Sequence, residues 1–400
     1  MLRRDFVASA VLAPVWARGE AESATAFVEI ENIFPLDIKH NHASCIVELP
    51  NGDLLTCWYR GSGERSADDV QVLGARKRRG SKQWTAPFLL ADQPGFPDTN
   101  PCLFVDSRQR LWLIWQTIIA NEWHTALTQY RITTDWDRPL EPRWQVSEPL
   151  LFIPRNFVQK VTEALEPMTK SSDERTAKWA ADRLHKARDR YFSRMGWMTR
   201  AHPVELPSGR IIVPLYSDGY DFSIMAITDD GGRSWTSSDP LPGFGNIQPT
   251  IARRKNGVLV AYMRDNGPPP KRLHVSESRD DGLTWSPVQD TDIPNPGSGA
   301  EVIVLKDGSW LLINNDLERG RHDLVVRLSD DEGRSWKWKR SLEVDNRAQG
   351  PSSFHYPSVV QSRDGLIHAS YSYFLNHLPA TAPRKTIRHA VFNQAWVKGG

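Results

Sequence analysis

One short motif returns at a nearly constant period and constrains the fold of this chain more than any other feature. Residues 228–235, 278–285 and 329–336 all read Ser/Thr-x-Asp-x-Gly-x-Ser/Thr-Trp, about 50 residues apart. The Asp carboxylate can accept backbone N–H bonds, the Gly can adopt a positive φ, and the Trp can fold back over a hairpin. The motif therefore predicts a tight structural turn in each of several repeated units.

A second repeat interleaves with the first: an apolar strand, a short turn that contains Gly in most copies, and another apolar strand. Its six copies are residues 42–58, 100–115, 203–216, 249–262, 301–314 and 356–371. Apolar and β-branched residues alternate along the copies, as in half-buried strands. Units of roughly 40 to 55 residues with about four strands each are typical of a β-propeller, whose circular closure leaves few exposed edges. The sequence predicts an all-β fold, a six-bladed β-propeller over residues 27–400.

The interval between the second and third copies is too long for one repeat unit. Residues 156–194 within it are charged, poor in β-branched residues, and carry small or apolar side chains at helical spacing. This pattern predicts a helical insertion between blades 2 and 3, with Ser171 and Glu174 as a capping box. The insertion is expected either as a lid over a pocket or as a helical hairpin packed on the side of the propeller.

The charge balance excludes two classes of partner. The 400 residues include 50 Lys and Arg against 48 Asp and Glu, a formal net charge of +2. Without a block of like charge, neither nucleic acid nor an anionic membrane surface is an expected partner. Beyond the N-terminus no apolar run approaches about 18 residues, so no membrane span is expected. Metal-ligand motifs and phosphate-binding Gly loops are absent too, and neither a metal nor a cofactor is expected.

The N-terminus and the cysteines bear on location. Arg3 and Arg4 precede a short apolar run, so residues 1–26 resemble a twin-arginine export signal, which indicates a periplasmic or secreted protein. Cys45 and Cys57 lie symmetrically about a turn and could face each other across a hairpin, whereas Cys102 has no obvious partner. Because a twin-arginine passenger folds before export, in a reducing compartment, buried free thiols are expected.

The Ser/Thr-x-Asp-x-Gly-x-x-Trp motifs resemble the Asp boxes of the sialidase (neuraminidase) superfamily. Together with the six repeats, they make about residues 30–395 similar to bacterial sialidase-like proteins with BNR/Asp-box repeats. The resemblance implies a glycosidase with a Tyr nucleophile, an acidic residue that activates it, an Asp acid/base and three arginines that hold a substrate carboxylate. A guanidinium suits this last role because its planar fork pairs with both carboxylate oxygens.

The resemblance assigns three residues by position. Tyr356, at the start of the last strand repeat, matches the nucleophile, while Arg264 and Arg321 match the second and third carboxylate-binding arginines. Two positions depart from the family pattern. His42 stands where the first arginine is expected, and Gln248 stands where the activating acid is expected. A Tyr without a general base is almost wholly protonated at neutral pH, since its usual pKa is about 10.

The remaining candidates come from the first blade and from strand entries. Glu64 and Asp69 lie in the loop where the family carries its acid/base; Glu64 is favoured because the preceding glycines permit a close approach to the pocket. Four polar residues near strand entries that face a propeller channel are expected to bind substrate. They are Asn100, Gln248, Asn314 and Arg388.

Three functions are consistent with these residues. The first is an exported, exo-acting, sialidase-like glycoside hydrolase that cleaves a terminal acidic sugar from a glycan. The second is a lyase or hydrolase directed at uronates, in which His42 and Tyr356 share the proton transfers, because His titrates near neutral pH. The third is a glycan-binding propeller without catalytic activity, consistent with the missing Arg and acid.

Overall fold

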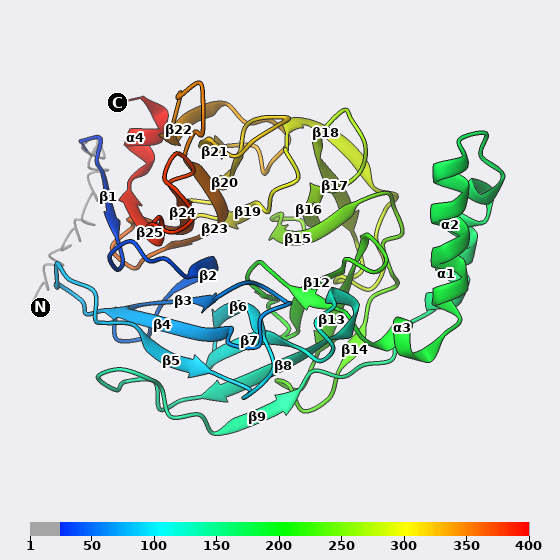
Figure 1. Ribbon diagram of the computed structural model, residues 1–400, viewed down its shortest axis with the longest axis horizontal. Helices are drawn as coiled ribbons and strands as arrows, with labels where there is room; N and C mark the ends of the chain where they lie inside the picture. Colours follow the sequence, from blue (N-terminus) through cyan, green and yellow to red (C-terminus); the bar gives the residue numbers. More distant parts are fainter. Residues whose placement is uncertain (1–24, 400) are drawn as a thin grey trace, which may run out of the picture.

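A computed structural model describes residues 25–399, which leaves the predicted export signal outside the described residues except for Thr25 and Ala26. Six antiparallel sheets, five of four strands and one of five, surround a common centre (Figure 1). The all-β, six-bladed propeller predicted from the repeats is confirmed. No helix among residues 25–399 is long and apolar enough to cross a membrane.

In blades 1, 2, 4 and 5 the strands run in chain order from the centre outward. Blade 1 contains β2 (His40–Glu48), β3 (Leu54–Gly61), β4 (Gln71–Lys77) and β5 (Phe88–Ala91), and blade 2 contains β6 (Asp98–Val105), β7 (Leu111–Ile118), β8 (Ala126–Thr133) and β9 (Val146–Pro149). Blade 3 contains β10 (Met198–Thr199), β11 (Val204–Glu205), β12 (Ile211–Ser217), β13 (Phe222–Thr228) and β14 (Thr236–Ser237). Blade 4 contains β15 (Asn246–Arg253), β16 (Leu259–Asp265), β17 (Arg272–Ser278) and β18 (Gln289–Pro294).

Blade 5 contains β19 (Glu301–Val304), β20 (Trp310–Asn315), β21 (Asp323–Ser329) and β22 (Trp338–Val344), and blade 6 begins with β23 (Ser353–Gln361), β24 (Ile367–Phe374) and β25 (Lys385–Phe392). The outermost strand of blade 6 is β1 (Val28–Asn32), from the other end of the chain. It pairs antiparallel with β25, from Val28 opposite Phe392 to Asn32 opposite Arg388. The ring is therefore closed by joining the first strand to the last. A short helix, α4 (Gln394–Lys398), follows β25.

The Asp motifs form turns between the last two strands of blades 3, 4 and 5. In the last copy, Asp331 Oδ1 accepts the Ser335 N–H at 2.8 Å, and Gly333 has a φ of 79°. A Cβ at Gly333 would lie 2.7 Å from the Trp310 ring, so only Gly fits there. The motif Trp336 packs edge-on against Tyr262 of blade 4, with ring centres 6.0 Å apart. The motif thus closes its own turn and also fastens its blade to the preceding one.

The helical insertion lies between β9 and β10 and contains α1 (Phe157–Leu165), η2 (Pro167–Lys170), α2 (Glu174–Ala187) and α3 (Arg190–Arg194). Another short 3₁₀ helix, η1 (Trp123–Thr125), precedes β8. Figure 1 shows α1 and α2 outside the ring of blades rather than over its centre. The insertion is a helical hairpin on the propeller's side, and Trp179 of α2 packs on Phe244, with ring centres 4.5 Å apart. Its N-cap is Asp173, which accepts the Thr176 N–H, so the predicted capping box at Ser171 is wrong.

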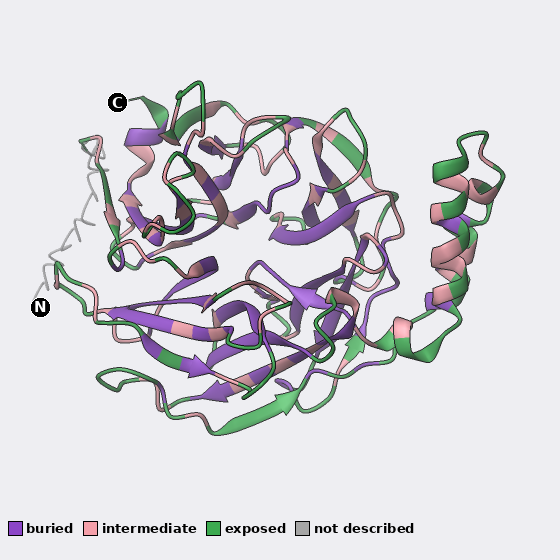
Figure 2. Ribbon diagram, in the orientation of Figure 1, coloured by how far each residue is buried: buried purple, intermediate pink, exposed green. Residues whose placement is uncertain are grey.

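Most buried residues lie in the strands of the blades rather than in the helical insertion, as the purple strands in Figure 2 show. Apolar clusters fill the space between neighbouring blades; one example joins Leu311 and Ile313 of blade 5 to Val359 and Ala369 of blade 6. The three cysteines are buried and unbonded, as expected. Packed blades of this kind give a rigid frame around the axis, on which the candidate site is built.

Candidate active site

A bulge in the innermost strands directs side chains towards the propeller axis. In blades 1, 2, 4 and 6 the register between the first two strands shifts at one residue with positive φ. These residues are Ala43, Asn100, Gln248 and Tyr356, with φ of 53°, 44°, 54° and 49°. Positive φ is uncommon for such residues, and bulges often re-aim a side chain beside a functional site. Gly299 holds the matching place in blade 5, where a Cβ would lie 3.0 Å from Tyr356 Cδ1.

Tyr356 lies at the centre of this ring. Its Oη accepts hydrogen bonds from Arg264 Nη1 at 3.0 Å and from Gln248 Nε2 at 3.2 Å. The guanidinium carbons of Arg200 and Arg321 lie 5.0 and 5.5 Å from the centre of its ring. Burial raises the pKa of Tyr356, but the charges of Arg264 and Arg321 and the Gln248 hydrogen bond lower it more, so the pKa lies below its usual value. The surroundings favour the phenolate even without an acidic partner.

Arg200 is a cation that the sequence reasoning missed. It lies in blade 3, directly after β10, and its guanidinium donates to the backbone carbonyls of Ser44 at 3.4 Å and Pro357 at 3.0 Å. These bonds hold it against the Tyr356 ring. The family pattern gave no reason to look in blade 3, but Arg200 aligns with the bulge residues of the other blades, two residues before His202.

His42 stacks on Tyr356, with ring centres 4.5 Å apart and planes 30° apart. Its Nδ1 lies 3.0 Å from Ser372 Oγ. Burial and the charges of His40 and His355 hold the pKa of His42 well below its usual value. His42 is therefore a neutral imidazole and a weak base beside Tyr356. The predicted proximity of His42 and Tyr356 is present in the structure.

Arg321 is positioned by a second histidine, which the sequence reasoning also missed. Its Nη1 donates to His355 Nδ1 at 2.6 Å and its Nη2 donates to the Gly297 carbonyl at 2.7 Å. His355 immediately precedes Tyr356, so the strand that carries the Tyr also orients this arginine. A signal was present in the sequence, since His355 and His42 are the two histidines next to the bulges.

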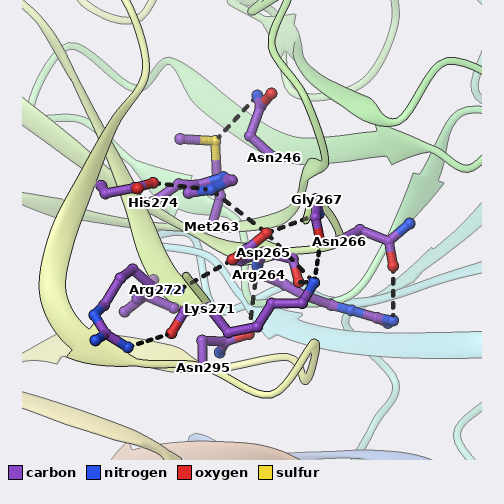
Figure 3. Close-up of polar contacts among 12 residues, drawn as sticks. Asn246, Met263, Arg264, Asp265, Asn266, Gly267, Lys271, Arg272, His274 and Asn295 are labelled. Carbon is purple, nitrogen blue, oxygen red and sulfur yellow. Dashed lines mark hydrogen bonds and ion pairs between the residues drawn. The ribbon is translucent and has the colours of Figure 1, made fainter. Parts of the chain in front are cut away.

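Arg264 depends on the carboxylate that follows it in β16. Asp265 is buried and accepts the N–H groups of Gly267 at 2.7 Å and Arg272 at 3.0 Å, which fixes the turn after the strand (Figure 3). Arg264 Nη2 also donates to Asn266 Oδ1 at 3.3 Å. The guanidinium is thereby held beside Tyr356. Arg264 Nε and Gln248 Oε1 are buried without a hydrogen-bond partner among the described residues, as expected where a ligand supplies one.

Glu64 reaches the site, but in the wrong protonation state for the predicted acid. Its Oε1 accepts from Tyr59 Oη at 3.0 Å and lies 3.0 Å from His40 Nε2. Burial raises the pKa of Glu64, but the hydrogen bond and charge of His40 lower it further, to below its usual value. Glu64 is thus a carboxylate at neutral pH. It can accept a proton or stabilise positive charge, whereas a proton donor is needed elsewhere.

Asp218 fits the role of proton donor, and it was not predicted from the sequence. It directly follows β12, at the rim where β16 also ends with Arg264 and Asp265. Burial raises the pKa of Asp218 to about 6, although the charge of Arg264 opposes the rise. Its charge in turn raises the pKa of Tyr216, which places it close to the Tyr356 cluster. The position at a strand end was the available signal, but no family position pointed to this turn.

Asn100 and Gln248 join the site through one hydroxyl. Asn100 Nδ2 and Gln248 Nε2 each donate to Tyr216 Oη at 3.3 Å. Both residues come from bulges on inner strands, Asn100 in blade 2 and Gln248 in blade 4, and both are buried. Their placement beside Tyr356 agrees with the predicted role in substrate binding.

Three predicted site residues do not join the cluster. Asp69 is exposed and bound to Lys39 Nζ and Ser62, whose backbone N–H is the main cause that lowers the Asp69 pKa to about 2. Asn314 donates to the Pro294 carbonyl inside the propeller, and Arg388 pairs with Glu343 and lies over the Tyr373 ring. The contacts of Asn314 and Arg388 place them away from Tyr356, because position near a strand entry does not reveal whether a side chain faces the axis or the neighbouring blade. Asp69 was assigned from its place in the blade-1 loop, and this place does not reveal whether its side chain turns to solvent.

One group of side chains has the spacing of a metal site, although no metal motif is present in the sequence. Ligand atoms of His40, His42 and Glu64 all lie within 4.8 Å of one another. However, Lys385 Nζ lies 2.8 Å from His40 Nδ1, and the charges of Arg321 and Arg200 act on His42. With these cations around it, the group is better suited to an anionic ligand than to a metal cation.

The fold and this cation-rich axial cluster together define a sialidase-like propeller. Residues 52–369 match the family model described as "BNR repeat-like domain", and the chain belongs to that family. A relative named anhydrosialidase, from Macrobdella decora, is 28% identical over 182 residues, which are 41% of this chain and 24% of that protein. The match therefore spans about a quarter of the relative's length.

Solved structures show the same fold at low identity. A leech intramolecular trans-sialidase complexed with 2,7-anhydro-Neu5Ac has a TM-score of 0.68 at 13% identity, over 92% of this chain and 71% of that chain. A protein of unknown function from Dyadobacter fermentans has a TM-score of 0.66 at 16% identity, over 92% and 99% of the two chains. At these identities the likeness concerns the fold alone.

Proposed function

We propose that this protein is an exo-acting glycosidase that cleaves a terminal, carboxylate-bearing sugar from a glycan, with Tyr356 as the nucleophile. The observation that carries this proposal is the pair of donors on Tyr356 Oη, Arg264 and Gln248. An arginine guanidinium cannot accept a proton, and the amide Nε2 of Gln248 only donates, so both contacts stabilise the phenolate. A lowered pKa is an established way to activate a nucleophile without a neighbouring base.

Each remaining residue has a role in the proposed reaction. Arg264 and Arg321 hold the substrate carboxylate. Tyr356 Oη bonds to the anomeric carbon as the bond to the leaving oxygen breaks, and Asp218 donates its proton to that oxygen. A water then attacks the anomeric carbon, Asp218 takes one of its protons, and Tyr356 is released. Glu64 stabilises the positive charge that develops on the sugar ring.

The relatives support sialosides as the first substrates to test. The leech structure contains 2,7-anhydro-Neu5Ac and was prepared with 3'-sialyllactose. The twin-arginine-like residues 1–26 support an exported protein that meets glycans outside the cytoplasm; cell fractionation tests this location.

Elimination across a uronic acid is a second candidate, favoured by one observation. The neutral His42 stacks on Tyr356, so the two groups can act on one bound sugar. In this reaction one of them removes the proton next to the carboxylate, and the other donates a proton to the leaving oxygen. The product carries a carbon–carbon double bond and no water is added.

The test is to incubate the protein with sialosides and with uronate-terminated oligosaccharides, and to record products by mass and ultraviolet absorbance. The glycosidase proposal predicts a free sugar with one water added, whereas elimination gives an unsaturated product. Tyr356→Phe should abolish turnover with an unchanged Tm, and Tyr373→Phe, in the same blade with its ring on Phe354, should retain it. Binding without any product would contradict both reactions and indicate a glycan-binding propeller.

A further inference from the structure

A second ring of side chains lies two residues beyond the axial bulges. It consists of Cys45, Cys102, His202, Thr250, Glu301 and Ser358. Three of its members, His202, Thr250 and Glu301, line a cavity of about 490 Å³. The other lining residues lie farther along the inner strands, so this cavity faces away from Tyr356. Nothing in the proposed glycosidase reaction uses this ring.

Three hydrogen-bond donors face the sulfur of Cys45, and one acceptor, the Leu103 carbonyl, lies 3.6 Å from it. The Leu103 N–H and His202 Nε2 each lie 3.2 Å from Cys45 Sγ, and Cys102 Sγ lies 3.8 Å away. A neutral thiol is a weak acceptor, whereas a thiolate accepts several such bonds. The three donors come from blades 2 and 3, so the fold itself builds this environment.

His202 is held as an imidazolium by what its two nitrogens face. Nδ1 lies 2.7 Å from Glu301 Oε1, and Nε2 lies 3.0 Å from the Ile46 carbonyl as well as facing Cys45. Because both neighbours are acceptors, both nitrogens carry protons. Burial lowers the pKa of His202, but the charges of Cys45 and Glu301 raise it well above its usual value. Glu301 is fixed in turn by the His202 and Val359 N–H groups.

The other two cysteines differ from Cys45 in ionisation. Burial raises the pKa of Cys45, but hydrogen bonds from the other two cysteines and the charge of His202 bring it well below its usual value. Burial raises the pKa of Cys57 and of Cys102 well above the usual value, so both stay thiols. Cys57 lies directly opposite Cys45 on β3 and is equally buried, which makes it an internal control.

We propose that Cys45 is a site of oxidation by hydroperoxides and that Cys102 is its resolving thiol. The Cys45 thiolate attacks the outer oxygen of the hydroperoxide, the O–O bond breaks, and the alkoxide or hydroxide that leaves takes a proton from His202. Cys45 becomes a sulfenic acid. The Cys102 thiol then forms the disulfide with Cys45, and its proton leaves with the sulfenic hydroxyl as water. The two thiols lose two electrons, which reduce the peroxide.

The burial of Cys45 within this second ring of side chains limits which oxidants can react with its sulfur. Cys45 is only 1% exposed and does not line the cavity, whereas His202, which contacts its sulfur, does. Hydrogen peroxide is close to water in size, so it needs a much smaller opening to reach the Cys45 sulfur than a bulky aromatic disulfide reagent does. The structure thus predicts rapid reaction with hydrogen peroxide and slow reaction with such a reagent.

The experiment treats the folded full chain with hydrogen peroxide and identifies cysteine products by peptide mass. Wild-type protein should form the Cys45–Cys102 disulfide and keep Cys57 free. In Cys102→Ser, the Cys45 sulfenic acid should accumulate and be trapped by dimedone, at least about 10-fold faster than any adduct at Cys57. His202→Gln should slow the reaction, with the far-ultraviolet circular dichroism and the Tm measured in parallel.

Two results would overturn the proposal. One is a Cys45 that stays reduced in the wild-type protein while methionines in the same sample are oxidised. The other is oxidation of Cys45 and Cys57 at equal rates, which would show that the donors around Cys45 have no effect. Since both readouts use wild-type protein, they stand even where a variant does not fold.

Discussion

The oxygen of Tyr356 shows how a residue can keep a reactive state after its expected partner is lost. Gln248 occupies the place where the resemblance predicts an acid, yet its amide donates to the same oxygen as Arg264. The two donors, together with Arg200 and Arg321 over the ring, favour the ionised form by electrostatics rather than by proton transfer. Loss of an acid from the family pattern therefore does not by itself imply loss of activity.

The raised pKa of Asp218 predicts a pH dependence of kcat/KM. Its pKa of about 6 means that it carries a proton below that pH and loses it above. The kcat/KM profile should therefore break near pH 6, and proton donation should decline as pH rises further. Asp218→Asn should remove the break and lower kcat by about 10²- to 10⁴-fold.

Asp221, in the same turn, provides the matched control for this profile. It accepts from Arg183 and Asn266 at the rim, and its charge helps to raise the Asp218 pKa. Asp221→Asn should therefore keep a break in the profile but move it to lower pH, whereas Asp218→Asn should remove the break. A wild-type profile that is flat across pH 6 would show that Asp218 is not the proton donor.

Sequence was sufficient for some site residues and not for others, for a physical reason. The structure brings Tyr356, Arg264 and Arg321 together, and the family resemblance had assigned each of them by its position in the repeats. Asp218 and Arg200 were missed because their roles depend on burial and on the neighbouring blade, which no local pattern records. Asn314 and Arg388 were misassigned since two faces of a blade carry polar residues at the same strand ends.

At the scale of elements, the Asp motif is a small unit with two functions, turn closure and attachment to the preceding blade. Its predicted role as a turn came from chemistry alone: a carboxylate, a Gly and a Trp at fixed spacing. The attachment could not be predicted, because the contact between Trp336 and Tyr262 joins residues of different blades. The helical insertion was located by its spacing, whereas its position beside the ring depended on contacts such as Trp179 with Phe244.

Adjacent aspartates in one motif allow a controlled stability test. Asp331 accepts from the Ser335 N–H, the Ser335 hydroxyl and the Ser329 hydroxyl, whereas Asp330 contacts only Lys337 at 3.3 Å among the described residues. Asp331→Ala should destabilise the fold by about 1 kcal/mol, and Asp330→Ala should change it much less. Thermal unfolding of both variants measures the difference.

The same pair has a predicted pH dependence. Burial raises the pKa of Asp331, but its hydrogen bonds from Ser335 lower it to about 2. A depressed pKa adds stability that is present above the usual Asp pKa, near 4, and is lost as pH falls towards 2. The Tm difference between wild-type protein and Asp331→Ala should therefore shrink below pH 4. A difference that stays constant down to pH 2 would contradict this assignment.

For the whole molecule, the period of the repeats predicted the number of blades, but not how the ring is closed. Residues 28–32 form a short strand in which the side chains of Val28 and Ile30 are 36% and 38% exposed. This strand lies outside the six copies of the strand repeat. Its partner β25 is more than 350 residues away. Pairing at such a separation leaves no local signal in the sequence.

Removing this closure should destabilise the ring. A chain that begins at Ile33 lacks β1 and leaves β25 as an open edge, which favours pairing with other chains. Compared with a chain that begins at Thr25, it should show a lower Tm and more association by size-exclusion chromatography. Equal values for the two chains would mean that β1 contributes little to the closure.

The pairing of β1 with β25 also sets an order of events during synthesis. At about 5 to 20 residues per second, β25 leaves the ribosome roughly 20 to 70 s after β1. During that time β1 has no strand to pair with, and the most recently finished blade has no following blade to pack against. The nascent chain is therefore a partial ring whose first strand stays unpaired until the last strand arrives.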